Sequence, residues 1–120
     1  MALTAYDLDG TIIISPFKNV QLRKFFWRMN PSINKSDVEY IITARTSRWK
    51  IVTWLTCKIC GLHNIKKIIF NPVDRWDIEY VSNWKCRCLM DHNFDAYVDN
   101  NCALLDAIRA NGFKGELRNV

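Results

Sequence analysis

The chain has 120 residues, of which 49% are hydrophobic and 24% charged, a composition typical of a single globular domain rather than of a disordered or fibrous protein. The 17 basic and 12 acidic residues give a net charge of +5, which favours anionic partners such as phosphorylated molecules or nucleic acids. The N-terminal residues lack the pattern of a secretion signal, and no apolar run reaches the roughly 20 residues of a membrane span. We therefore expect one domain over residues 1–120, in the cytoplasm and without a membrane partner.

Short apolar segments alternate with longer periodic ones, which indicates strands alternating with helices. In chain order we predict a strand at 3–7, a helix at 21–29, a strand at 38–44, a helix at 47–60, a strand at 67–70, a helix at 77–91, a strand at 94–99, a helix at 101–111 and an edge strand at 115–118. Asn30-Pro31, Gly61 and Gly112 are typical of the ends of three of these helices. The alternation predicts an α/β fold with a mostly parallel sheet covered by helices on both sides.

Two of the predicted helices have apolar residues aligned on one face, and we expect that of the second helix to face the sheet. On the helix at 47–60, and just beyond it, the stripe consists of Val52, Leu55, Ile59 and Leu62. On the helix at 77–91 it consists of Ile78, Val81 and Cys88, and Lys85 falls on the same line. A lysine that faces a sheet is costly unless it meets a carboxylate or a phosphate, so we expect Lys85 to lie near Asp7. The alternative is a rotated helix with Trp84 inward and Lys85 reaching solvent.

Polar side chains follow three of the predicted strands, at the point where each strand ends. They are Asp7 and Asp9, Thr43 and Arg45, and Asp99 and Asn100. In open parallel sheets ligands bind at the carboxyl ends of the strands, near the place where the strand order reverses. We therefore expect these groups to form one site.

The pair Asp7 and Asp9 suits phosphoryl transfer. One carboxylate can attack phosphorus and form an acyl-phosphate, and a second carboxyl group nearby can protonate the leaving oxygen and later activate water. Gly10 permits a tight turn after the strand, and Thr11 offers a hydroxyl and a backbone N–H group to a phosphate. Mg²⁺ is the natural cation between nucleophile and phosphate, because it needs only one or two carboxylates besides the substrate, and Asp99 supplies a further ligand.

Four segments of the chain resemble the four motifs of the haloacid dehalogenase (HAD) superfamily, and they occur in the family's order. Residues 5–11, Ala-Tyr-Asp-Leu-Asp-Gly-Thr, resemble the first motif, and residues 41–45, Ile-Ile-Thr-Ala-Arg, resemble the second. Lys85 stands where the third motif has its lysine, and residues 97–101, Tyr-Val-Asp-Asn-Asn, are similar to the fourth, acidic motif. The resemblance implies a Rossmann-like three-layer α/β/α sandwich and a phosphomonoester phosphatase that works through an aspartyl-phosphate.

The resemblance also implies a role for each matching residue. Asp7 would be the nucleophile and a metal ligand, and Asp9 the general acid/base, with its backbone carbonyl on the metal. Thr43 would bind the phosphoryl group, Lys85 would neutralise the nucleophile and the phosphate, and Asp99 would bind Mg²⁺. Contacts with substrate would come from Gly10, Thr11, Ala44, Arg45 and Asn100, the last of which replaces a second acid common in the family.

The intervals between the motifs are filled by the predicted helices and strands, so we expect no cap domain and an open site, suited to a nucleotide or a nucleic-acid end. Segments 42–45, 54–55, 61–62, 70–72, 99–100 and 104–106 resemble the phosphatase half of polynucleotide kinase–phosphatases. That resemblance implies that Arg45 and Arg48 contact substrate phosphates. Trp49, Trp76 and Trp84 are candidates for stacking a base, although we expect at least two of the three in the core.

Other functions stay open at this point. The alternative substrates are a phosphoprotein or a small metabolite, and no oligomeric state is indicated. The alternative from another class is a non-catalytic module that binds RNA or DNA through its basic surface, which would have no use for acids where phosphates dock. The cysteine pairs 57/60 and 86/88, with His63 and His92, could be assembled into a zinc site, but we expect reduced thiols buried on helices.

Overall fold

The computed structural model describes residues 3–14 and 28–120. Its main sheet has five strands in the spatial order β5-β4-β1-β6-β7, and each neighbouring pair is parallel. These strands are β1 (Thr4–Tyr6), β4 (Tyr40–Thr46), β5 (Lys67–Asn71), β6 (Ala96–Asp99) and β7 (Glu116–Asn119). A separate antiparallel pair consists of β2 (Ile13–Ile14) and β3 (Arg28–Met29). The predicted α/β fold with a mostly parallel sheet is confirmed.

The connections that follow β4, β5 and β6 are helical. They contain the α-helices α2 (Lys50–Ile59), α3 (Ile78–Asp91) and α4 (Cys102–Ala110) and the short 3₁₀ helix η2 (Ser47–Trp49). The described part of the connection from β1 to β4 contains β2, β3 and the 3₁₀ helix η1 (Lys35–Asp37). Side-chain caps begin two of the helices: Asp77 accepts the N–H of Tyr80 at the start of α3, and Asn101 accepts that of Leu104 at the start of α4. Among residues 3–14 and 28–120, no helix combines the length and the apolar character that crossing a membrane would take.

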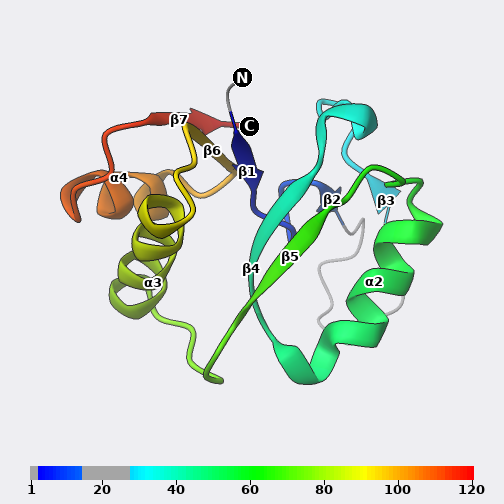
Figure 1. The fold of residues 1–120 in the computed structure, drawn as a ribbon, viewed down its shortest axis with the longest axis horizontal. Helices are drawn as coiled ribbons and strands as arrows, with labels where there is room; N and C mark the ends of the chain where they lie inside the picture. Colours follow the sequence, from blue (N-terminus) through cyan, green and yellow to red (C-terminus); the bar gives the residue numbers. More distant parts are fainter. Residues whose placement is uncertain (1–2, 15–27) are drawn as a thin grey trace.

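The sheet has an apolar core on each face. Successive strand residues point to opposite faces, so Ala5 and Tyr97 belong to one core while their neighbours Tyr6 and Val98 belong to the other. The first core includes buried residues of α3 and α4, and the second includes Cys57 of α2. Figure 1 shows the same division, with α3 and α4 together on one side of the sheet and α2 on the other.

The helix predicted at 21–29 is corrected at its end. Residues 15–27 lie outside the part of the chain that the structure describes, and the last two positions form strand β3 rather than helix. Met29 pairs with Ile13 across the antiparallel ladder, and the N–H of Asn30 donates to the carbonyl of Ile12 at 2.8 Å. Cross-strand pairing therefore overrides the local helical pattern here.

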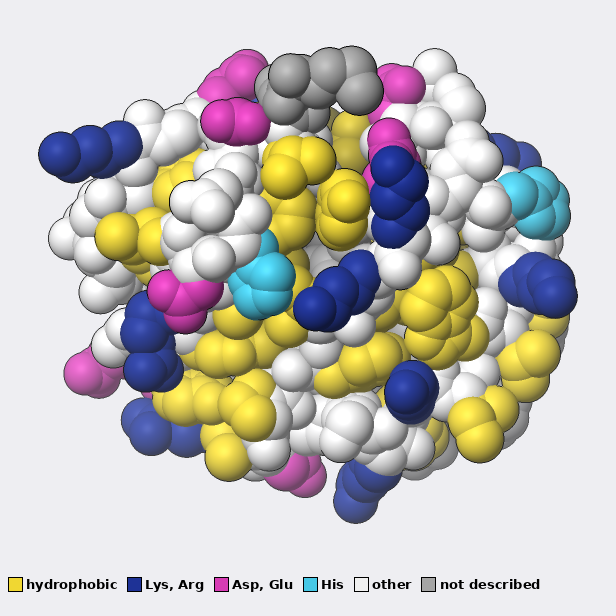
Figure 2. Space-filling view, viewed as in Figure 1, with side chains coloured by type: hydrophobic (Ala, Val, Ile, Leu, Met, Phe, Trp, Pro, Cys, Tyr) yellow, Lys and Arg dark blue, Asp and Glu magenta, His cyan; other side chains and the backbone are white. Residues whose placement is uncertain are grey.

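The apolar face defined by the spacing on α2 does not pack against the sheet. Val52, Leu55 and Ile59 are 48%, 55% and 83% exposed, whereas Leu62, beyond the end of the helix, is buried. The residues that face the sheet are smaller: Thr53 and Cys57 are buried, one helical turn apart. Thr53 also accepts a hydrogen bond from the Arg45 guanidinium, which ties this face of the helix to the end of β4. Figure 2 shows apolar side chains at the surface over α2, on the right, with Lys and Arg between them.

Candidate active site

The predicted site lies where the order of the parallel strands reverses. From β1 the chain moves outward through β4 to β5, and then returns to the other side of β1 to form β6 and β7. The crevice at the carboxyl ends of β1 and β6 is thus the switch point at which open α/β sheets bind ligands. Tyr6 pairs with Val98 across these two strands, and the N–H of Asp7 donates to the carbonyl of Val98 at 2.9 Å. This pairing brings Asp7 and Asp99 to the same end of the sheet.

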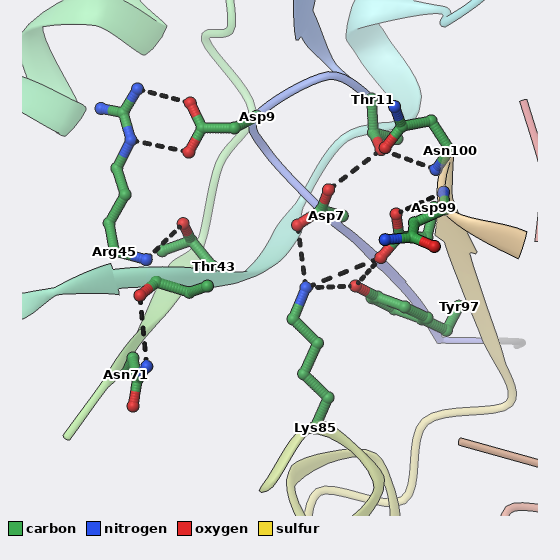
Figure 3. A network of polar contacts seen from close by, with 12 residues as sticks. Asp7, Asp9, Thr11, Thr43, Arg45, Asn71, Lys85, Tyr97, Asp99 and Asn100 are labelled. Atoms are coloured by element: carbon green, nitrogen blue, oxygen red, sulfur yellow. Dashed lines mark hydrogen bonds and ion pairs between the residues drawn. The ribbon is translucent and has the colours of Figure 1, made fainter. Parts of the chain in front are cut away.

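Lys85 links the two carboxylates in a buried network (Figure 3). Its side chain is 1% exposed, and its Nζ donates to Asp7 Oδ1 at 2.8 Å and to the hydroxyl of Tyr97 at 2.5 Å. The Tyr97 hydroxyl in turn donates to Asp99 Oδ2 at 2.7 Å, and Lys85 Nζ lies 3.7 Å from the same oxygen. The expected contact of Lys85 with Asp7 is therefore confirmed. Because Lys85 is buried, the alternative with Lys85 reaching solvent is wrong, although Trp84 is buried as well.

The electrostatics of this network make ionised Asp7 costly. Burial raises the pKa of Asp7 to about 6; the cation of Lys85 opposes this shift, and the charge of Asp99 adds to it. Burial and the two carboxylates also raise the pKa of Tyr97 well above its usual value, so Tyr97 keeps its proton and can donate it to Asp99. A single lysine cation thus lies beside two buried carboxylates. When both carboxylates are ionised, the network carries a net negative charge.

The turn after β1 positions the second carboxylate oxygen of Asp7 through Thr11. The Thr11 hydroxyl lies 3.1 Å from Asp7 Oδ2 and accepts the N–H of Asn100 at 3.0 Å. Gly10 has φ of +82°, and a Cβ at this position would meet the Asn100 side-chain nitrogen at 2.8 Å. Glycine is favoured here because this φ strains other residues, and a Cβ would also force the Asn100 side chain to shift. Thr11 is itself fully buried, so it positions Asp7 and Asn100.

Asp9 is turned away from Asp7 and pairs with Arg45 (Figure 3). The pair is bidentate, with Arg45 Nη2 2.6 Å from Asp9 Oδ1 and Arg45 Nε 2.8 Å from Asp9 Oδ2. Thr43 is fully buried, and its hydroxyl accepts the N–H of Arg45 at 3.1 Å. From the sequence we expected Asp9 to act as general acid/base and Arg45 to contact the substrate. In the structure the two side chains form an ion pair with each other.

A cavity of about 390 Å³ opens beside Asp7. Most of the predicted site residues line it, including Asp7, Asp9, Arg45, Lys85, Asp99 and Asn100. Gly10, Thr11 and Thr43 do not line it, so the predicted contact of Thr43 with a phosphoryl group stays a prediction. A cavity of this size accommodates a small organic ligand and not merely a phosphate.

Several residues at the site were not assigned a role from the sequence. Tyr97 is two positions before Asp99, which places both on one face of β6, but its bonds to Lys85 and Asp99 depend on the neighbouring helix. Asp74 lines the cavity from the loop after β5, beside Trp76, which the sequence had offered as a candidate for stacking a base. The expectation that two of the three candidate tryptophans lie in the core is wrong, since Trp84 is buried while Trp49 and Trp76 are exposed.

The donor set at Asp7 and Asp99 fits Mg²⁺. Both side chains offer carboxylate oxygens at one cavity. Burial, and after it the charge of Asp99, raise the pKa of Asp7, and a divalent cation beside both carboxylates would favour their ionised forms. Within the described ranges no three His, Cys, Asp or Glu side chains are grouped as a metal site. The Asp9 carboxylate bonds to Arg45 instead. Two carboxylates suffice for Mg²⁺ when the substrate phosphate supplies further ligands.

The cysteine pairs do not converge on a common zinc site. Cys57 and Cys60 lie in the core on the α2 side, whereas Cys86 and Cys88 lie in the core on the α3 side. All five cysteines are unpaired thiols. Burial raises the pKa of Cys57 to about 12, which keeps this thiol protonated and a poor metal ligand.

The chain matches no model of a known protein family and no curated protein. Its function is therefore inferred from the geometry and chemistry of the site.

Proposed function

We propose that the protein is a Mg²⁺-dependent phosphomonoester hydrolase with a capless, HAD-like three-layer fold, in which Asp7 accepts the phosphoryl group. The observation that carries the proposal is the setting of Asp7. It is a carboxylate at the carboxyl end of the central strand, lining a cavity, with Lys85 on one oxygen and Thr11 on the other. Burial raises the pKa of Asp7 to about 6, and groups with strongly shifted pKa values cluster at functional sites.

The proposed reaction has two displacements at phosphorus. In the first, an Asp7 oxygen attacks phosphorus, the bond from phosphorus to the leaving oxygen breaks, and Asp9 gives that oxygen a proton. In the second, Asp9 takes a proton from water as the water attacks phosphorus, the bond to Asp7 breaks, and inorganic phosphate leaves. For this cycle Asp9 must leave its ion pair with Arg45, which releases the guanidinium to bind phosphoryl oxygens.

The other residues of the site neutralise or orient the charged groups during both steps. Lys85 neutralises Asp7 before attack and the phosphoryl oxygens after it, and Tyr97 holds Asp99 by donating its hydroxyl proton. Asp7, Asp99 and the carbonyl oxygen of Asp9 would hold Mg²⁺, whose charge would offset the repulsion between nucleophile and phosphate. We also propose a reducing compartment such as the cytoplasm, which suits the five unpaired thiols.

A non-catalytic module that binds nucleic acid is the second candidate, and a basic stretch of the sequence favours it. Between Glu39 and Asp74 the chain has no acidic residue. The basic residues in this stretch are Arg45, Arg48, Lys50, Lys58, Lys66 and Lys67. A module that only binds nucleic acid would gain nothing from the buried carboxylate of Asp7 in its cavity, so we prefer the hydrolase.

A substrate screen tests the proposal. We expect the wild type to hydrolyse phosphomonoesters with Mg²⁺ and to lose this activity in EDTA; the panel contains p-nitrophenyl phosphate, mononucleotides, 3′- and 5′-phosphorylated oligonucleotides, phosphopeptides and sugar phosphates. Asp7→Asn should lower kcat/KM by at least ~10³-fold, because the nucleophile is removed. If wild type and Asp7→Asn release phosphate at the same rate on every substrate and metal, the binding module is the better account.

A further inference from the structure

Trp76 is a large aromatic side chain held at the mouth of the proposed active site. It is 62% exposed and lines the same cavity as Asp7 and Lys85, on the loop that joins β5 to α3. An exposed tryptophan at a single surface position needs no explanation. Trp76 differs because its exposed ring borders the cavity into which the proposed nucleophile opens.

The loop that carries Trp76 is bonded at both ends. The Asn71 side chain donates to the carbonyl of Arg75 at 3.0 Å and to that of Ala44 at 3.3 Å, and it accepts the N–H of Val73 at 3.2 Å. On the other side of Trp76, Asp77 caps α3 and pairs with Arg75, whose guanidinium lies over the ring of Tyr80. The backbone that carries the indole is therefore held in place before any ligand arrives, which lowers the entropic cost of binding.

The charges around the cavity argue against a polymeric substrate. Its described lining contains four carboxylates, on Asp7, Asp9, Asp74 and Asp99, and two cationic side chains, on Lys85 and Arg45. Both cations already bond to carboxylates. The described lining therefore offers charge for one phosphoryl group but no separate cation for the neighbouring phosphodiesters of an oligonucleotide.

We propose that Trp76 stacks on the base of a nucleoside monophosphate whose phosphate lies at Asp7, and that it thereby selects nucleotides among phosphomonoesters. The proposal rests on the proposed function. Every nucleobase has a π-face that an indole can cover, so the contact favours bases in general over aliphatic leaving groups. Trp76 contributes binding and leaves the bond-breaking steps to Asp7 and Asp9.

The test compares a nucleotide with an aliphatic phosphomonoester. We expect Trp76→Ala to lower the ratio of kcat/KM for adenosine monophosphate to that for glycerol 3-phosphate by about 5- to 150-fold, mainly through KM for the nucleotide. Trp76→Phe should restore most of the ratio because it restores a stacking ring. Trp49→Ala is the matched control, since Trp49 is also exposed but does not line the cavity, and it should leave the ratio unchanged. The wild type should prefer the mononucleotide to the same nucleotide at an oligonucleotide end.

A binding measurement keeps this inference separate from the hydrolase proposal. In the Asp7→Asn background, adding Trp76→Ala should raise the Kd for adenosine monophosphate by the same 5- to 150-fold, whether or not the wild type turns over any substrate. An equal loss on nucleotide and glycerol phosphate, an unchanged Kd, or a preference for the oligonucleotide end would overturn the inference. Absence of turnover with the expected loss of binding would overturn the hydrolase alone.

Discussion

Asp7→Asn is expected to make the folded protein more stable at neutral pH while it removes the proposed phosphatase activity. Burial raises the pKa of Asp7 from 3.8 to about 6, so its ionised form is less favourable in the folded than in the unfolded chain. Asparagine has the same shape and no charge, and its carbonyl can still accept from Lys85. We expect urea denaturation at pH 8 to give a free energy of unfolding higher by on the order of 1–3 kcal/mol.

The difference in free energy of unfolding between Asp7→Asn and the wild type should depend on pH. Because the pKa of Asp7 is raised on folding, its contribution to stability is fully present below pH 3.8 and is lost as the pH rises through about 6. The gain in free energy of unfolding that Asp7→Asn gives over the wild type should therefore be small at pH 4 and reach its full size above pH 6. An Asp7→Asn protein that is less stable than wild type at pH 8 would show that ionised Asp7 supports the fold.

Lys85→Met is expected to destabilise the protein strongly and to remove the proposed phosphatase activity. The Nζ of Lys85 is the described cation nearest to Asp7 and Asp99, both buried, and its loss leaves two uncompensated carboxylates. Breaking a buried ion pair by removing one partner costs about 3–5 kcal/mol, which we expect in the free energy of unfolding at pH 7.5. The deficit should shrink as the pH falls, since Lys85 lowers the pKa of Asp7 and its loss lets this buried carboxylate take up a proton more readily in the folded state.

Lys66→Met is the matched control for this loss. Lys66 pairs with Glu39 at 2.6 Å, a distance as short as that in the buried pair, but both side chains are exposed. Solvent screens such pairs, so the free energy of unfolding should hardly change. Similar losses in Lys66→Met and Lys85→Met would contradict the claim that burial makes Lys85 essential.

The parallel sheet and the position of the site could be predicted from the sequence because both follow from local patterns. Apolar runs ending in acids place Asp7 and Asp99 at the carboxyl ends of parallel strands, and the parallel pairing of β1 with β6 makes them neighbours. The inward direction of Lys85 followed from its place on an apolar line, since a buried lysine needs an anion.

Features that depend on contacts distant in sequence were not predictable in the same way. The stripe of Val52, Leu55 and Ile59 has helical periodicity, but periodicity defines a face without saying whether the sheet lies on that side. The sheet takes the opposite face because Thr53 and Cys57 are small and Thr53 bonds to Arg45. The pairing of Asp9 with Arg45 likewise arises only when β4 lies beside β1.

The most direct test of the central claim is chemical trapping of the phosphoryl group on Asp7. Wild-type protein is mixed with Mg²⁺ and its best phosphomonoester substrate, denatured within the first turnover and treated with borohydride, which reduces an aspartyl-phosphate to homoserine. Peptide mass spectrometry should then find homoserine at position 7 and nowhere else, and none in protein that received no substrate. Rapid turnover without modification of Asp7, or with modification of a different carboxylate, would contradict the account.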